Sequence, residues 1–132
     1  MPAELAKPAF DLGIVTDDID ASVGFYRDLL GFQPLSVLAR ETGDIHLLIA
    51  GEMLVKLVDA PTAAPGPKGA ITDATGLRYV TFWVTNLSDL HTELTTAGVR
   101  VLREPFEVAP GTTAMLVFDP DGNVVEILET AA

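Results

Sequence analysis

The stretch FDLGIVTDDIDASVGFYRDLLGF, Phe10 to Phe32, decides the fold of the first half of the chain. Its opening run, residues 10–15, is mostly apolar and ends at two aspartates, which predicts a buried strand. Four apolar side chains then recur at three- and four-residue spacing: Ile19, Val23, Tyr26 and Leu30. This spacing predicts a helix that Asp17, Asp18 or Asp20 caps and that Gly31 ends.

Strand signals continue after this helix. Apolar or alternating runs at residues 34–39, 45–50 and 53–59 are separated by the turn signals Glu41–Asp44 and Gly51–Glu52. The first module, about residues 8–59, therefore has the element order βαβββ. Residues 60–76 are rich in proline, glycine and alanine without periodicity, and we expect a linker there.

The same order starts again after residue 76. A strand at 79–85 precedes a helix capped by Asn86 or Ser88 and ended by Gly98, and strands at 99–108, 113–118 and 123–128 follow. Superposition matches Ile19 with Leu87, Gly31 with Gly98 and Leu57 with Ile127. A second βαβββ module, about residues 77–130, is therefore predicted as an internal repeat.

Composition restricts the classes of partner. The chain has 132 residues, enough for one domain, and no cysteine, which excludes disulfides and zinc–thiolate sites. Its 19 acidic and 8 basic residues give a net charge of −11, which repels nucleic acid and anionic membranes. Residues 1–9 lack the apolar run of a signal peptide or membrane helix. We expect a cytoplasmic protein with a small organic molecule as its partner.

Two motifs carry a family resemblance. Phe10 to Phe32 resembles the opening strand and helix of the vicinal-oxygen-chelate superfamily, and FDPDGNVVEIL, Phe118 to Leu128, resembles its closing hairpin. The superfamily includes glyoxalases, bleomycin resistance proteins and extradiol dioxygenases. The resemblance implies a single α+β domain over residues 1–132, in which two βαβββ modules form curled mixed sheets around a cavity with the helices outside. It also implies a homodimer.

Strand alternation predicts which side chains line that cavity, because successive residues point to opposite faces. If Glu126 points inward, Val124 and Leu128 do so too, and the repeat places Leu54, Lys56 and Val58 likewise. On the first strands of the modules, the predicted inward residues are Asp11, Gly13 and Val15, and Tyr79, Thr81, Trp83 and Thr85. We expect Trp83, Thr81, Thr85 and Met115 to form a mixed wall suited to an aromatic ligand.

The resemblance assigns four positions to metal ligands, and this chain departs from the pattern at three of them. Metal-dependent relatives place histidine on the first strand of each module and glutamate or glutamine on the last. The matching residues here are Asp11, Lys56, Tyr79 and Glu126. A lysine ammonium has no free lone pair and repels a cation, so we expect no metal cofactor.

The sequence leaves other roles of these residues open. A divalent metal held by Glu126 with Asp11 and His46 is one alternative, although a two-residue turn at Gly51–Glu52 would pair His46 with Leu57 on the helix side. His91 is expected to be a surface or boundary residue of the second helix. Lys56 with Glu126, and Asp11 with Tyr79, are predicted to meet across the cavity as structural pairs, as ligand anchors, or as an acid and base.

The leading prediction for function is a metal-independent binding protein for a small organic molecule, as in the bleomycin-resistance branch. The net charge favours a cationic compound. The alternatives are an isomerase or lyase using Asp11, Lys56, Tyr79 and Glu126, a degenerate metal-dependent enzyme using Glu126, and a partner-binding module with a vestigial cavity.

Overall fold

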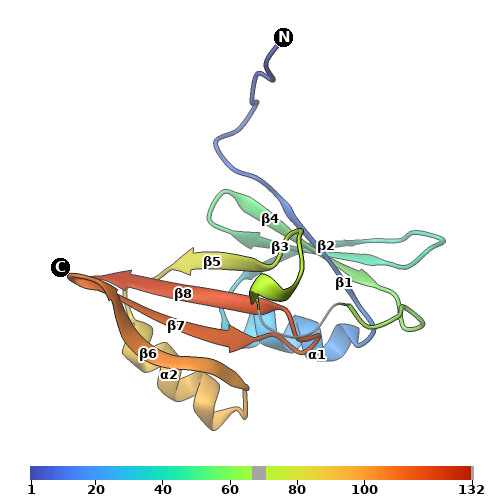
Figure 1. Ribbon diagram of the computed structural model, residues 1–132. Helices are drawn as coiled ribbons and strands as arrows, with labels where there is room; N and C mark the ends of the chain where they lie inside the picture. Colours follow the sequence, from blue (N-terminus) through green and yellow to red (C-terminus); the bar gives the residue numbers. More distant parts are fainter. Residues whose placement is uncertain (67–70, 132) are drawn as a thin grey trace. The chain divides into compact units, whose positions relative to one another are not determined.

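The computed structural model describes residues 1–66 and 71–131 and divides the chain into two compact units, Met1–Ala64 and Pro65–Ala132. Each unit contains one βαβββ module with a four-stranded mixed sheet (Figure 1). The predicted α+β class and the two βαβββ modules are therefore confirmed.

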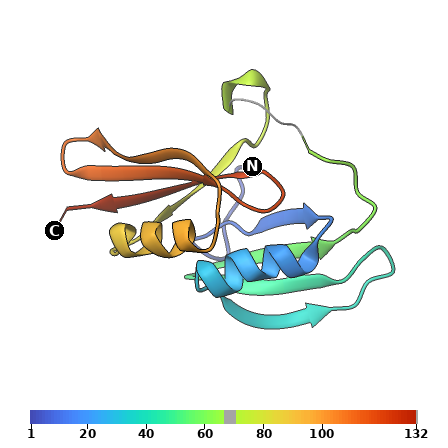
Figure 2. The ribbon, with the colours of Figure 1, turned by 90° about the horizontal axis from the view of Figure 1, so that it is seen from below.

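The N-terminal module begins with β1 (Leu12–Thr16), α1 (Ile19–Val23) and the π-helical segment η1 (Gly24–Leu29). It continues with β2 (Gln33–Leu38), β3 (Ile45–Ala50) and β4 (Met53–Asp59). The strand order in the sheet is β1-β4-β3-β2, with β1 parallel to β4 and the other pairs antiparallel. Figure 2 shows α1 and η1 lying along one face of this sheet.

The first helix differs from the regular helix that the apolar spacing predicts. Asp18 is the cap, since its Oδ1 accepts the Ala21 N–H at 3.1 Å. From Gly24 the hydrogen bonds widen, and the Leu30 N–H donates to the Phe25 carbonyl. This wider turn changes the rotation per residue, so the successive rings of Phe25 and Tyr26 both become buried.

The segment between the modules is not wholly irregular. Residues 71–73 form the short 3-10 helix η2 (Ile71–Asp73) inside the predicted linker. Residues 67–70 of the predicted linker lie outside the described residues.

The C-terminal module contains β5 (Tyr79–Trp83), α2 (Leu87–Thr96), β6 (Val101–Ala109), β7 (Thr112–Phe118) and β8 (Val124–Thr130). Its strand order, β5-β8-β7-β6, and its parallel β5–β8 pair repeat the plan of the first module. Leu57 faces Ile14 across β1–β4, and Ile127 faces Phe82 across β5–β8, so the predicted repeat holds residue by residue.

The second helix is capped from a distant strand. Asn86 stands at the cap position, as one of the two predicted candidates, but its side chain makes no cap hydrogen bond. Instead, Glu129 Oε1 on β8 accepts the Leu87 N–H at 2.9 Å. A carboxylate at this end also suits the helix dipole, so the contact fixes α2 to its sheet.

Each sheet has one face buried beneath its helix. In the N-terminal module this face carries Val55 and Leu57, and in the C-terminal module it carries Met115, Val125 and Ile127, all fully buried. Leu90 and Leu94 of α2 complete the second core. The charged side chains of Lys56 and Glu126 lie on the opposite faces of these sheets.

Candidate functional site

Strand register places Lys56 on the face of the N-terminal sheet that points away from the helix. We call this the Lys56 face, and the pairing of β1, β3 and β4 gives its residues: Gly13, Val15, Ile45, Leu47, Ile49, Leu54, Lys56 and Val58. Asp11 lies immediately before β1. Gly13 and Leu47 flank Lys56 on the neighbouring strands. The predicted facing of Leu54, Lys56 and Val58 is thus confirmed.

Asp11 has a partner that the sequence prediction missed. Its Oδ1 accepts hydrogen bonds from Lys7 Nζ at 2.5 Å and from the Leu54 N–H at 3.1 Å. The Lys7 ammonium foremost, then the Leu54 N–H and the charge of Lys56, lower the pKa of Asp11 below its usual 3.8. Asp11 is therefore a stable carboxylate at neutral pH.

The C-terminal module presents a second polar face, and register again decides its members. We call it the Glu126 face, and it comprises Tyr79, Thr81, Trp83, Arg103, Phe106, Ala114, Leu116, Phe118, Val124, Glu126 and Leu128. Thr81 lies opposite Glu126, just as Gly13 lies opposite Lys56 in the other module. Lys56 and Glu126 are therefore equivalent positions of the repeat, as predicted.

Glu126 is held in place by a threonine and bordered by aromatic rings. Thr81 Oγ1 donates a hydrogen bond of 2.9 Å to Glu126 Oε1, and both side chains are partly buried. On the same strand as Thr81, Tyr79 and Trp83 expose 55% and 64% of their surface. The result is a hydrogen-bonded carboxylate on a face that also carries two accessible aromatic side chains, opposite Val124 and Leu128.

Met115 does not belong to this face, contrary to the prediction. It pairs with Ile127 and is fully buried on the helix side. The hairpin between β7 and β8 pairs Phe118 with Val124, so counting back by twos reaches Leu116 and Ala114 rather than Met115. Thr85, the other predicted member of the wall, is exposed just beyond the end of β5.

The two histidines lie on the helix sides of their sheets. His46 pairs with Leu57 across the two-residue turn at Gly51–Glu52, which confirms the predicted pairing. His46 is thus on the opposite face of the sheet from Lys56. Asp11 and His46 therefore do not converge within the N-terminal module.

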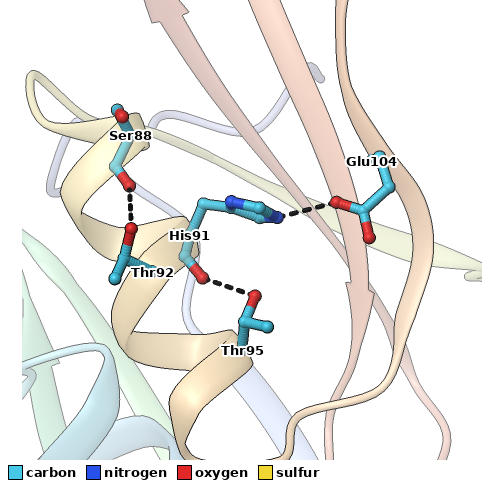
Figure 3. Close-up of polar contacts among 5 residues, drawn as sticks. All are labelled: Ser88, His91, Thr92, Thr95 and Glu104. Carbon is cyan, nitrogen blue, oxygen red and sulfur yellow. Dashed lines mark hydrogen bonds and ion pairs between the residues drawn. The ribbon is translucent and has the colours of Figure 1, made fainter.

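His91 projects from α2 toward β6, where its Nε2 lies 2.7 Å from Glu104 Oε2 (Figure 3). On the same helix, the hydroxyls of Thr92 and Thr95 donate to the carbonyls of Ser88 and His91 at 3.2 and 2.7 Å. This cluster ties the helix to the sheet and lies away from the Glu126 face. His91 keeps 29% of its side chain exposed, which agrees with the predicted surface or boundary position.

Sequence reasoning also missed two side chains on the Glu126 face. The Arg103 guanidinium lies 3.5 Å from the ring centroid of Phe106, and the pair occupies the β6 margin of this face. Three register shifts interrupt the pairing of β6 with β7, so alternation alone does not predict which β6 residues share the face. The only sequence feature that could have indicated these two side chains was the presence of charged and aromatic residues in β6.

Within residues 1–66 and 71–131, no three histidine, aspartate or glutamate side chains converge in a way that would hold a metal ion. No helix in those ranges has the length and apolar character needed to cross a membrane.

Comparison with known proteins identifies the family that shares this architecture. The profile of the Glyoxalase/Bleomycin resistance protein/Dioxygenase superfamily matches residues 10–127. Uncharacterized protein YaeR of Escherichia coli is 30% identical over 128 residues, covering 93% of this chain and 96% of its own. Uncharacterized protein YwkD of Bacillus subtilis is 29% identical over 130 residues, covering 95% and 98%.

A solved structure agrees in fold. The glyoxalase family protein from Enterococcus faecalis superposes with a TM-score of 0.71 at 22% identity, over 96% of this chain and 97% of that one. With the profile match over nearly the whole chain and two βαβββ modules of matching register, the chain belongs to the glyoxalase, bleomycin resistance protein and dioxygenase superfamily.

Proposed function

We propose that this protein binds a small organic cation on the Glu126 face and releases it chemically unchanged. The arrangement of Thr81, Glu126 and the two exposed rings of Tyr79 and Trp83 carries the proposal. A carboxylate fixed by a hydroxyl attracts an ammonium group, and the flanking rings add cation–π and stacking contacts. The net charge of −11 attracts such a ligand from a distance.

The metal that the family often uses does not fit the residues at the matching positions. Lys56 offers an ammonium instead of a lone pair, and Asp11 Oδ1 already accepts two hydrogen bonds. Tyr79 stands where the family usually has a histidine, and an imidazole is the donor that such metals prefer. Glu126 alone keeps the expected ligand type, so we derive no metal-dependent step.

Proton-transfer chemistry is the rival function, and Asp11 argues against it. A general base works best when its pKa lies near the working pH. The ammonium of Lys7 and the Leu54 N–H instead lower the pKa of Asp11 below 3.8. Asp11 is therefore a weak base, which favours binding over an isomerase or lyase reaction.

Benzylamine is a suitable first probe, since it combines an ammonium group with one aromatic ring. Trp83 is the only tryptophan, so its emission reports binding on this face directly. We expect a saturable change that calorimetry reproduces, and an affinity at least about tenfold lower for Glu126→Gln, as loss of a charged hydrogen-bond partner predicts.

The matched control is Glu52→Gln, which makes the same charge change in the exposed β3–β4 turn. It should bind benzylamine as the natural protein does. Equal affinities in the natural protein and Glu126→Gln would contradict the proposed site. Conversion of any bound compound into a product, detected by mass spectrometry, would contradict binding without turnover.

We further propose that the two modules act as one domain and that the protein is a homodimer. Leu35 and Val37 support the dimer, because both are more than half exposed on the edge strand β2. Exposed apolar edge strands need covering to avoid uncontrolled association. Light scattering that gives a stable monomer of 14.0 kDa at high micromolar concentration would refute this proposal.

A further inference from the structure

A row of four residues crosses the Glu126 face from one sheet margin to the other. The strand register aligns Arg103 on β6 with Leu116 on β7, then Glu126 on β8 and Thr81 on β5. Adjacent strands lie about 4.8 Å apart, so the backbones of Arg103 and Glu126 are separated by about 10 Å with Leu116 between them. The positive charge of Arg103 and the negative charge of Glu126 thus lie on either side of the apolar residue Leu116.

The guanidinium of Arg103 is pre-positioned for a ligand. It stacks on Phe106 with 3.5 Å between its central carbon and the ring centroid, which restricts the long side chain. Among the described residues, no carboxylate lies within ion-pair distance of it. Its hydrogen-bond donors are therefore available to an anion.

A second arginine adds positive charge at the β6 margin of the Glu126 face. Arg100, just before β6, stacks on Phe118 at 4.1 Å, and its carbonyl accepts the Phe118 N–H at 2.9 Å. Phe118 belongs to the same face, two residues along β7 from Leu116. The N-terminal module has no such feature, because Ser36 occupies the position opposite Leu47 that corresponds to Arg103.

We infer that the ligand is a zwitterion, with an ammonium group at Glu126, a carboxylate at Arg103 and an apolar body about one ring long over Leu116. This inference rests on the proposed binding of a cation at Glu126 and adds a second subsite to it. A zwitterion has no net charge, so the charge of −11 that would repel a simple carboxylate does not oppose it. Arginine suits the anionic end because its planar fork binds a carboxylate with two parallel hydrogen bonds.

Three matched compounds test the inference. 4-(Aminomethyl)benzoate carries both groups across one ring, benzylamine carries the ammonium alone, and 4-methylbenzoate carries the carboxylate alone. Titrations followed by Trp83 emission and by NMR should show that the zwitterion binds at least about tenfold more tightly than either of the others, as one added charged hydrogen bond predicts.

Variants of Arg103 test whether this residue provides the higher affinity for the zwitterion. In Arg103→Gln the ratio of the zwitterion affinity to the benzylamine affinity should fall to within about twofold of one. Arg103→Lys should retain part of the gain, because it keeps the charge but loses the fork. Arg27→Gln removes a positive charge that is already paired with Asp28 in the other module, and it should keep the full ratio.

The outcomes separate this inference from the proposed function. Equal binding of benzylamine and the zwitterion by the natural protein, with a loss of both on Glu126→Gln, would overturn the carboxylate subsite and leave the cation site standing. An unchanged ratio of zwitterion affinity to benzylamine affinity in Arg103→Gln would also overturn the carboxylate subsite. Failure of both amines to bind would refute the two proposals together.

Discussion

Thr81 Oγ1 donates a hydrogen bond of 2.9 Å to Glu126 Oε1 across the parallel pair of β5 and β8. The equivalent residue of the N-terminal module is Gly13, which has no side chain to orient Lys56. The repeat therefore keeps the backbone plan of the two modules, but a hydroxyl orients the charged side chain at this position only in the second. This difference is why the Glu126 face carries the proposed site.

Removing the Thr81 hydroxyl should weaken ligand binding. Thr81→Val keeps the shape of the side chain but loses the donor, and a single net hydrogen bond of about 0.5–1.5 kcal/mol corresponds to roughly three- to tenfold lower affinity for benzylamine. Thr81→Ser keeps the donor and should bind nearly as the natural protein does. Equal affinities for the valine and serine variants, measured by calorimetry, would show that the hydroxyl does not orient Glu126.

The turn before β8 should depend strongly on Asp119, which is 4% exposed. Its Oδ1 accepts the N–H groups of Asp121 and Asn123 at 3.0 and 2.8 Å, and its Oδ2 accepts from Asn123 Nδ2 at 2.8 Å. Asp119→Ala leaves these donors without their acceptor and should cost about 2–3 kcal/mol in the free energy of unfolding. Asp119→Asn retains an oxygen acceptor and should cost less. Urea unfolding measures both, and an unchanged midpoint for the alanine variant would contradict this account.

Two turn glycines are expected to be structural. Gly31 and Gly122 have φ angles of 79° and 87°, a left-handed conformation that glycine adopts without strain. A Cβ atom at either position would meet no atom within 4 Å, so the cost of alanine arises from backbone strain alone, about 1 kcal/mol.

Gly24 provides the control for these two variants, because its φ of −57° is helical and a Cβ there also meets no atom within 4 Å. Gly24→Ala should leave the melting temperature unchanged or raise it. Gly31→Ala and Gly122→Ala should each lower it. Unchanged melting temperatures in both would refute the structural role.

The pKa of Asp11 should respond more to Lys7 than to Lys56. Lys7 contributes the strongest effect through a hydrogen bond, whereas Lys56 acts only through its charge. NMR titration of the Asp11 carboxyl should therefore show a larger upward pKa change in Lys7→Gln than in Lys56→Gln. The opposite order would contradict the observed contact.

The same contact has a pH dependence with a defined sign. Because folding lowers the pKa of Asp11, its contribution to stability is present above the ordinary value of 3.8 and is lost as the pH falls through the lower folded value. In Lys7→Gln, the loss of unfolding free energy at acid pH should therefore occur at a different pH than in the natural protein. Near neutral pH, the difference in unfolding free energy between the natural protein and Lys7→Gln should not vary with pH.

Lys56 should oppose metal binding. Its ammonium repels a divalent ion, so the natural protein should bind nickel weakly, and Lys56→Gln should bind it more tightly. Arg40→Gln makes the same charge change on the exposed β2–β3 loop and should not alter the affinity. Calorimetry at one pH and salt concentration compares the three proteins. Tight stoichiometric binding by the natural protein that disappears in Glu126→Ala would overturn the metal-free proposal.

Much of the fold could be predicted from the sequence because its signals are local. The repeated order βαβββ follows from runs of apolar residues, from helix periodicity and from turn glycines such as Gly31 and Gly98, which adopt φ angles of 79° and 82°. Alternation along β4 and β8 likewise predicted the facing of Lys56 and Glu126, because successive strand residues point to opposite faces wherever the strand is regular.

The prediction for Met115 was wrong although the sequence contained the needed signal. The turn that pairs Phe118 with Val124 fixes the register of the whole hairpin, and that register puts Met115 beside Ile127 on the helix side. Since the side-chain period of a strand is two, counting from the wrong residue reverses the face of every later one.

The sequence alone determined the two modules, their turns and the equivalence of Lys56 with Glu126, since each depends on patterns within a few neighbouring residues. Only the tertiary structure decided that Thr81 binds Glu126, that Lys7 pairs with Asp11 and that Arg103 joins the Glu126 face. The first contact joins residues 45 positions apart, the second joins residues four positions apart in a segment without regular structure, and the third depends on register shifts in β6. The first and third depend on how strands pair and bulge, and the second depends on the path of a segment without periodicity; local residue patterns specify neither.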